Sequence, residues 1–439
     1  MVLIKNIKLI ALATFWMVSA TTIGQVFTLE QCIDSAWSNN ARIKVLNQKQ
    51  LLIDEKAKEV KANLIPKVYL NGDYKYFIDL PYQLMPQSIF GGPEGNFKAV
   101  QFGVPHVITA NATIQIPIYL GQIYAAVEKV DLSKAELAVQ IEKTKEDIFV
   151  DITNLYRNVQ LLQNRLLFLE TSIQYSQSLC KTANNLYKAD LATSTDVKKV
   201  QLQVMVLENQ QLTVKSSINQ ILDALKVYMG MPIEEQLLVT SEIAEFKAKL
   251  YEEKTPVAIE LLQLKQQGLE ADIKALQKTR YLPDVASYGS LGTSGFGYNS
   301  TNNSFLDFYA TNFVGIKATY PIFNGTVTNK QIKQKQYELG IASIEQDALN
   351  DQHILTLQKA KSDLNIANKN LELVDSQLSL MTEIFEESEL LYKEGLASTA
   401  DVLQVNTELL QMQQNRITAL LDCYAADLEI KRITRNILK

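Results

Sequence analysis

The chain has little of what metal, disulfide and catalytic sites are built from. Its 439 residues include three cysteines, widely spaced and outside any Cys-x-x-Cys pair, and only two histidines, His106 and His353, far apart in the sequence. Neither a disulfide framework nor a zinc or histidine-based site is supported by this composition. No nucleophile–base arrangement or pair of carboxylates emerges either, so a hydrolytic enzyme is the least favoured interpretation. We expect no catalytic step, no cofactor and no metal.

The chain also lacks an excess of positive charge. Its formal net charge is −5, which makes a nucleic-acid partner an unfavourable interpretation. The first residues carry Lys5 and Lys8, then an apolar run over 9–20, then small residues. This pattern predicts a signal peptide over 1–24 and therefore export, the alternative being a buried N-terminal helix.

No other stretch approaches the ~20 consecutive apolar residues that a membrane-spanning helix requires. The run over 9–20 is itself too short to span. Any insertion of the mature chain into a membrane must therefore use strands.

Proline and glycine are absent from two long stretches. Residues 122–229 contain neither, and residues 326–439 contain no proline and only Gly340 and Gly395. Apolar residues recur there at helical spacing, for example Ile148, Ile152 and Leu155. Each stretch is predicted to be a long helical hairpin, and the roughly 65 residues of one arm would span about 100 Å, which implies an extended coiled-coil-like body.

Shorter segments alternate between apolar and polar residues, as strands do. Val68, Leu70 and Tyr74 would point one way and Lys67 and Asn71 the other. The alternation predicts strand pairs at about 66–77 with 110–120, and at about 283–296 with 308–322. The segments between paired strands, about 78–109 and 297–307, are rich in Gly, Pro, Asn and Ser and are predicted to be exposed loops.

Three signatures occur twice, in one order, about 204 to 217 residues apart, which indicates a tandem duplication. The first pair is Leu-Ile-Pro-Lys-Val at 64–68 and Tyr-Leu-Pro-Asp-Val at 281–285. The second pair is Ile-Pro-Ile-Tyr-Leu-Gly at 116–121 and Tyr-Pro-Ile-Phe-Asn-Gly at 320–325. The third pair is Leu-Tyr-Lys-Ala-Asp-Leu-Ala-Thr at 186–193 and Leu-Tyr-Lys-Glu-Gly-Leu-Ala-Ser at 391–398. The predicted organisation after the signal peptide is a first repeat over 25–229, a connecting segment over 230–255 and a second repeat over 256–439. In each repeat a helix, a strand pair and a long helical hairpin follow one another, with hairpins over 122–229 and 326–437.

Four strands per chain are too few to close a barrel, and an open sheet edge is not tolerated in lipid. A membrane protein with this pattern must therefore oligomerise. The alternative is a soluble periplasmic coiled-coil protein, an adaptor or scaffold, in which the strands form a small packed sheet.

With these features the chain resembles the TolC family of outer-membrane efflux proteins over essentially its whole mature length. The resemblance rests most on the two hairpin turns and on the two Pro-bearing joints between strand and helix. It implies a mainly α fold with β structure: a homotrimer whose twelve strands form one outer-membrane β-barrel, continued by a helical tunnel across the periplasm. It also implies a passive channel in the outer membrane of a Gram-negative bacterium, serving efflux or type I secretion, with outer-membrane lipid, a periplasmic adaptor and an inner-membrane transporter as partners.

The resemblance assigns roles to the turns as well. Four residues match positions of the periplasmic gate that face the lumen: Tyr187, Asp196, Tyr392 and Asp401. Eight match the tips that dock the adaptor: Asp190, Leu191, Ala192, Thr193, Gly395, Leu396, Ala397 and Ser398. For Asp196 and Asp401 the spacing from Thr193 and Ser398 also fits plain helix caps, and each tyrosine also fits ordinary packing at a helix end. Asp190 stands where the second turn has Gly395, so the first turn must form without a glycine.

Overall fold

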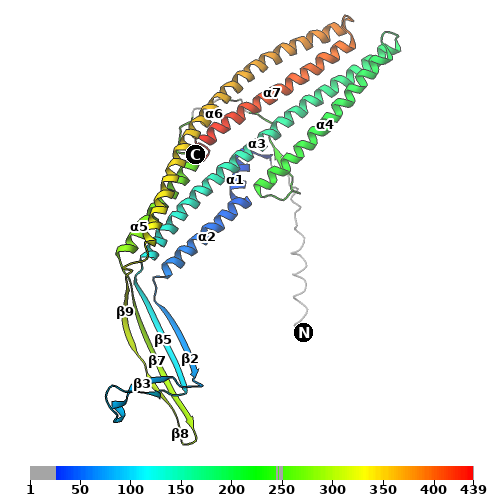
Figure 1. Cartoon of the computed structure of the whole chain (residues 1–439). Coiled ribbons are helices and arrows are strands. Elements are labelled where there is room, and N and C mark those ends of the chain that lie inside the picture. Colours follow the sequence, from blue (N-terminus) through cyan, green and yellow to red (C-terminus); the bar gives the residue numbers. More distant parts are fainter. Residues whose placement is uncertain (1–25, 244–245, 247–250, 439) are drawn as a thin grey trace, which may run out of the picture. The chain divides into compact units, whose positions relative to one another are not determined.

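The computed structural model of the chain describes residues 26–243, 246 and 251–438 (Figure 1). The predicted signal peptide over 1–24 lies outside the described residues. Two compact units make up the chain, and each takes segments from both predicted repeats. The hairpin unit comprises Met1–Leu46, Gln140–Val257 and Asn350–Lys439, and the sheet unit comprises Asn47–Val139 and Ala258–Leu349.

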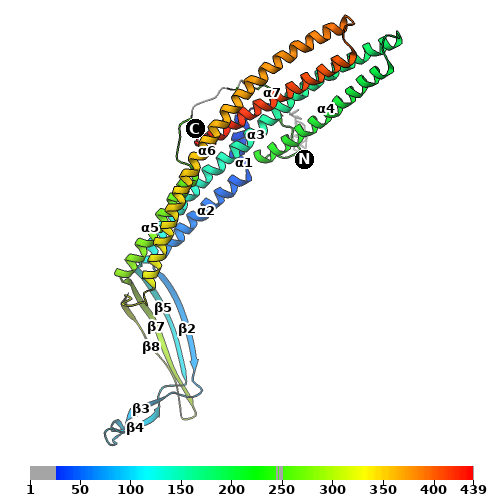
Figure 2. The same ribbon diagram turned by 45° about the horizontal axis from the view of Figure 1, so that its top comes forward.

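Three helices run from one unit into the other: α2 (Ala41–Ala62), α3 (Gly121–Lys188) and α6 (Val327–Lys393). The hairpin unit also holds β1 (Val26–Phe27), α1 (Leu29–Asn39), α4 (Ser194–Met229), β6 (Leu238–Val239) and α7 (Thr399–Ile433). In Figure 2 the α3–α4 hairpin and the α6–α7 hairpin lie side by side, each closed by one short turn. The absence of proline and of most glycines therefore predicted both hairpins correctly.

The core of the hairpin unit forms where α1 and the segment after α4 cover α3 and α4. Helix α1 begins at a capping box, in which Thr28 and Gln31 each bind the other's backbone N–H. Its buried face meets fully buried residues such as Ile148, Ile152 and Leu225. Strand β6 pairs in parallel with β1, and Leu237 and Val239 of the segment predicted to connect the repeats are buried in this core.

The sheet unit holds α5 (Val257–Tyr281) and a sheet in the order β2-β5-β7-β8, with β9 also paired to β7. Its strands are β2 (Lys67–Tyr76), β5 (His106–Tyr119), β7 (Asp284–Ser300), β8 (Asn303–Ala310) and β9 (Phe313–Thr319). All pairings are antiparallel. Strands β8 and β9 share one register on β7, and Asn312 bridges the gap between them, because its side-chain Oδ1 accepts a hydrogen bond from Gly292 N at 3.1 Å. The sheet thus has four strand positions, as predicted.

The cross-strand register brings most of the aliphatic side chains of the strands to one side, which we call the apolar face, whereas Val107, Phe296 and Phe313 lie on the other. Its larger members are Val68, Leu70, Tyr74, Tyr76, Ile108, Ile114, Ile116, Val285, Leu291, Leu306, Phe308, Val314 and Ile316. Most of these side chains are exposed, Leu70 and Val314 each to 84%. The opposite face carries polar groups such as Lys67, Asn71 and Thr113. At its edges, among the described residues, the sheet ends at β2 on one side and at β8 and β9 on the other.

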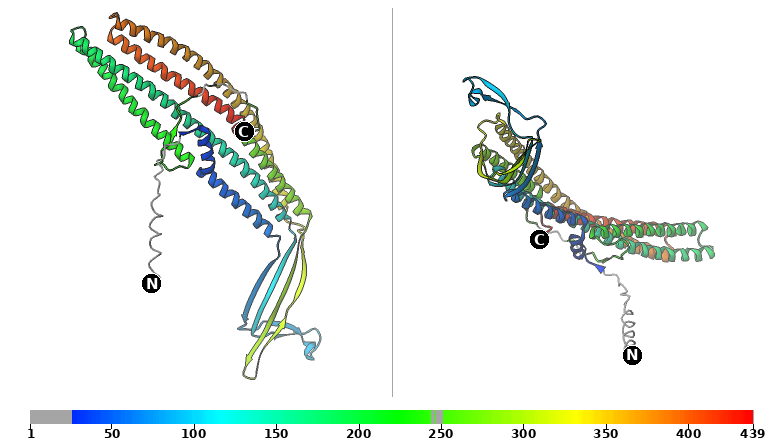
Figure 3. Two further views of the ribbon diagram at one scale, coloured as in Figure 1. Left: turned by 180° about the vertical axis from the view of Figure 1, so that it is seen from behind. Right: turned by 90° about the horizontal axis from the view of Figure 1, so that it is seen from below.

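Both predicted loops contain regular secondary structure, although none of the residues 78–109 is buried. The segment 78–109 contains β3 (Tyr82–Pro86), a 3-10 helix η1 (Gln87–Phe90) and β4 (Phe97–Gln101). Strands β3 and β4 form a hairpin that projects from the end of the sheet (Figure 3). The start of β5 at His106, rather than at 110, shortens this excursion further.

The predicted loop over 297–307 is strand almost throughout. Strand β7 continues to Ser300 and β8 begins at Asn303, so only a two-residue turn remains. The glycines here accommodate large neighbours across the sheet instead of forming a loop. A Cβ added at Gly297 would lie 3.2 Å from Leu306 Cδ1. The last strand was also predicted too long, since β9 ends at Thr319 and residues 320–322 lie outside it.

Candidate functional site

The two turns that close the helical hairpins have the same backbone geometry. In the first turn Asp190 adopts a left-handed conformation with φ 60°, and in the second Gly395 does so with φ 77°. The residue that follows each of them donates its N–H back into the preceding helix: Leu191 to the Leu186 carbonyl at 2.9 Å, and Leu396 to the Leu391 carbonyl at 2.8 Å. This is the Schellman arrangement that ends many helices. The first turn therefore forms without a glycine, as predicted.

Each following helix begins at a capping box. Thr193 Oγ1 accepts a hydrogen bond from Asp196 N at 3.2 Å and donates one to Asp196 Oδ2 at 2.7 Å. In the second turn Ser398 and Asp401 repeat the pair at 3.2 and 2.7 Å. These bonds, with one from the backbone N–H of Thr193 or Ser398, hold the pKa of both carboxyls below 3.8, the ordinary value. Both aspartates are thus helix-capping residues and remain charged at neutral pH.

The two gate-candidate tyrosines occupy different environments. Tyr187 is 47% exposed. Tyr392 is half-buried and packs against a cluster from the other hairpin that includes Leu179 and Val200. Its hydroxyl accepts a hydrogen bond from Thr399 Oγ1 at 3.4 Å. Within the hairpin unit, Tyr392 therefore connects one tip to the other.

A cleft of about 720 Å³ lies between the two tips. Asp196 and Tyr392 line it together with Tyr175 and Glu389. Tyr175 meets Phe385 edge-on, with ring centroids 5.2 Å apart, and burial followed by the nearby Glu389 raises the pKa of its hydroxyl to about 12. The sequence analysis did not identify Tyr175 or Glu389, because no local pattern announces a contact between residues that are so far apart in the chain.

Each of the two predicted docking turns exposes one leucine. Leu191 and Leu396 occupy equivalent positions in the two turns and are 75% and 74% exposed. Ala192 and Ala397 are half-buried and line the cleft. The apolar side chains that the two turns present to solvent are therefore the same in both repeats.

The described part of the chain shows no cluster of three or more His, Cys, Asp or Glu that could hold a metal ion. His106 contacts Tyr74 in the sheet unit, whereas His353 contacts Glu253 in the hairpin unit. Among the helices that the structure describes, none has both the length and the apolar composition to cross a membrane.

The sequence is similar to outer-membrane proteins. Residues 258–434 match the family model described as outer membrane efflux protein. The chain is 18% identical over 426 residues to the outer membrane protein TolC of Salmonella enteritidis, an alignment that covers 94% of this chain and 82% of that protein.

Solved structures of outer-membrane proteins share the fold. The outer membrane protein VceC from Vibrio cholerae is 15% identical with a TM-score of 0.69, covering 92% of this chain and 95% of that one. The Campylobacter jejuni CmeC outer membrane channel is 12% identical with a TM-score of 0.70, covering 92% of this chain and 85% of that one. The similarity extends over both units.

Proposed function

Because this chain belongs to the family of outer membrane efflux proteins, we propose that it is the passive channel of a tripartite efflux or type I secretion system. It is an outer-membrane protein that extends into the periplasm. In this role it takes substrates from an inner-membrane transporter and a periplasmic adaptor to the exterior. The chemistry is conduction, with no catalytic step.

The observation that carries the proposal is the sheet. Its apolar face leaves Leu70 and Val314 each 84% exposed, and its described edges, at β2 and at β8 and β9, have no partner strand. An apolar surface of this kind fits lipid, and lipid requires every strand edge to be paired. Three copies of four strand positions supply the twelve strands of one closed barrel, so a homotrimer satisfies both requirements.

The tips fit the periplasmic gate of this channel. The carboxylates of Asp196 and Asp401 are held by neutral cap groups, and neither aspartate is ion-paired in the described chain. Threefold symmetry would place three copies of the Asp401 carboxylate in one ring, which attracts cations and can be blocked by them. Tyr392, together with Tyr187, is proposed to narrow the lumen beside this ring.

The exposed turn residues fit the adaptor. Leu191 and Leu396 give each subunit two equivalent apolar contacts, so a trimer presents six. The other tip residues, Asp190, Thr193, Gly395 and Ser398, set the shape of the turns through backbone and cap geometry. We propose that the adaptor binds this ring of turns and that the inner-membrane transporter acts through it.

The second candidate is a soluble periplasmic adaptor or scaffold. Its sheet would be packed on one side. The exposure of most of the apolar face argues against a soluble protein, because a patch of this extent on a soluble chain promotes aggregation.

Single-channel conductance of the detergent-purified mature protein in a planar bilayer tests the proposal. Wild type is compared with Asp401→Asn with and without divalent cations, and Asp363→Asn, an exposed carboxylate on α6 away from the turns, is the matched control. Asparagine keeps an oxygen acceptor for the cap and removes only the charge. We expect reproducible pores, cation block in wild type and Asp363→Asn, and loss of block in Asp401→Asn.

Two results would contradict the proposal in different ways. A protein that stays in solution without detergent and gives no conductance would exclude the channel and favour the scaffold. Pores whose cation block is unchanged in Asp401→Asn would keep the channel and remove Asp401 from the lumen.

A further inference from the structure

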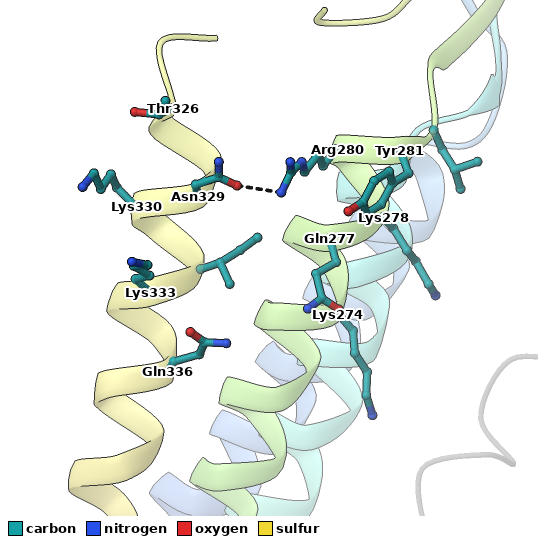
Figure 4. A pocket seen from close by; sticks show the side chains of 12 residues that line it. Lys274, Gln277, Lys278, Arg280, Tyr281, Thr326, Asn329, Lys330, Lys333 and Gln336 are labelled. Atoms are coloured by element: carbon teal, nitrogen blue, oxygen red, sulfur yellow. Dashed lines mark hydrogen bonds between the residues drawn. The ribbon is translucent and has the colours of Figure 1, made fainter. Parts of the chain in front are cut away.

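A basic cleft lies in the sheet unit where the helices adjoin the strands. It forms between the last turns of α5 and the first turns of α6 and has a volume of about 960 Å³ (Figure 4). Five cationic side chains line it: Lys274, Lys278, Arg280, Lys330 and Lys333. No carboxylate lines it, although the chain as a whole carries a net charge of −5.

The cations of the basic cleft have no anionic partner among the described residues. Arg280 donates to the neutral side-chain oxygen of Asn329 at 2.8 Å, and the four lysines make no ion pair. The nearby carboxylate of Asp272 is engaged elsewhere, with Lys129 at 3.3 Å and Lys335 at 3.9 Å. The lining of the cleft therefore gathers positive charge without a carboxylate beside it, whereas the groove that adjoins Lys274 is lined by Glu128, Asp131 and Glu270.

Helix stability accounts for only part of this charge. Lys278 and Arg280 lie in the last turn of α5, where cations favour the helix dipole. Lys330 and Lys333 lie near the beginning of α6, where cations oppose the dipole, and the first turn of α6 holds no acidic residue. An anion bound in the cleft would compensate both the lysines and the positive end of α6.

A series of contacts connects the basic cleft with the apolar face. Strand β5 bulges between Pro117 and Tyr119, which puts Tyr119 opposite Val285 on the apolar face. The Tyr119 ring stacks on Tyr124 with centroids 5.7 Å apart. Tyr124 and Lys274 line one adjoining groove, and Lys274 also lines the basic cleft.

Exposed aromatic and aliphatic side chains also line this cleft. Tyr281 and Leu282 line it and are 66% and 45% exposed, and the Arg280 guanidinium lies 5.4 Å from the centre of the Tyr281 ring. Tyrosine next to lysine and arginine at the end of an apolar surface is the pattern of a membrane–water boundary. Cations at that boundary favour anionic lipid headgroups.

We propose that the basic cleft binds the headgroup phosphate of an anionic glycerophospholipid in the periplasmic leaflet of the outer membrane. The proposal rests on the proposed insertion of the apolar face into lipid. Lys330 and Lys333 contact the phosphate from α6, Lys278 and Arg280 contact it from α5, and the acyl chains extend along the apolar face. Each subunit of the trimer holds one such lipid.

Binding of dioleoylphosphatidylglycerol to the delipidated, detergent-purified trimer tests the site, with dioleoylphosphatidylcholine as the zwitterionic comparison. Bound lipid is counted by native mass spectrometry. The test variant is Lys278→Gln with Lys330→Gln and Lys333→Gln, and a milder variant carries Lys333→Gln alone. The control, Lys359→Gln with Lys361→Gln and Lys369→Gln, removes the same charge from exposed positions of α6 remote from the cleft.

We expect wild type and control to retain phosphatidylglycerol in preference to phosphatidylcholine. The triple cleft variant should bind phosphatidylglycerol at least on the order of tenfold more weakly than wild type. The single variant should lie between them, which keeps the test meaningful if the triple variant fails to assemble. Equal retention by the cleft variants and the control would overturn the proposal. Displacement of phosphatidylglycerol by millimolar inorganic phosphate would also overturn the proposal, since the site would then bind free anions. Conductance of the same preparations reports separately on the channel.

Discussion

The two hairpin turns reach one geometry with different residues, and they differ in how they are anchored. Asp190 and Gly395 occupy the same left-handed position, and the same hydrogen bonds and capping boxes follow them. The packing of the side chains, in contrast, differs between the two turns. Tyr392 packs against the other hairpin, whereas its counterpart Tyr187 is 47% exposed.

This comparison separates shape from attachment. Shape is set locally by a few backbone and cap interactions, so duplication preserves it even where glycine is replaced by aspartate. Attachment depends on which surface a side chain meets, and the two repeats have different neighbours. The second tip is therefore expected to be coupled to the first through Tyr392, and a movable gate would have to break or rearrange that contact.

The largest effect is expected where the anchoring differs. Replacing Tyr392 with alanine removes a half-buried ring and a hydroxyl bonded to Thr399, which should cost about 2 kcal/mol of local stability. Tyr187→Ala should cost less than about 0.5 kcal/mol, because its ring is exposed. Hydrogen exchange of peptides covering both turns measures these free energies of opening. Equal costs at the two positions would show that the asymmetry has no energetic consequence.

A smaller, reciprocal effect is expected from exchanging the left-handed residues. Gly395→Asp should destabilise the second turn by about 1 kcal/mol, because a side chain disfavours positive φ. A Cβ at this position meets no atom within 4 Å, so the cost comes from the backbone alone. Asp190→Gly should stabilise the first turn by about 0.5 kcal/mol, the gain being limited by the entropy of glycine in the open state. Local hydrogen exchange is again the measurement, and two changes of the same sign would refute the equivalence of the turns.

Sequence reasoning reached the turns and helices because their signals are local. Long stretches without proline and glycine predicted the hairpins, and the spacing of Thr193 from Asp196 predicted a cap that the structure confirms. The alternation of apolar residues in the strands also predicted one apolar face. The proposed lumen and docking roles of the turn residues stay predictions.

Features that depend on distant partners were missed or misread. Gly297 was predicted to be a loop residue because the side chains that it accommodates, His106 and Leu306, lie on other strands. The basic cleft was missed because Lys278 and Lys330 come together only when α5 and α6 meet at the end of the sheet. Tyr175 and Phe385 meet for the same kind of reason, through the packing of two hairpins.

The smallest expected effect concerns acid, and it tests whether the two caps are equivalent. In each cap a hydroxyl and then a backbone N–H hold the pKa of the aspartate below 3.8. Because the pKa is depressed in the folded state, the stabilisation is fully present above the ordinary value and is lost as the pH falls through the depressed one. Protection of the first-turn amides of α4 and α7 should therefore be constant from neutral pH to about pH 5 and decline only below about pH 4.

Comparison of the two declines sharpens the test further. Lys199 adds an attraction at Asp196 that Asp401 lacks, so α7 should lose protection at a slightly higher pH than α4. The measurement is hydrogen exchange over a pH series, corrected for intrinsic rates, on wild type, Asp196→Asn and Asp401→Asn. Each asparagine variant should lose the acid-dependent decline at its own tip and keep it at the other. A decline that begins near neutral pH, or one that persists at the substituted tip, would mean that other groups control these helix starts.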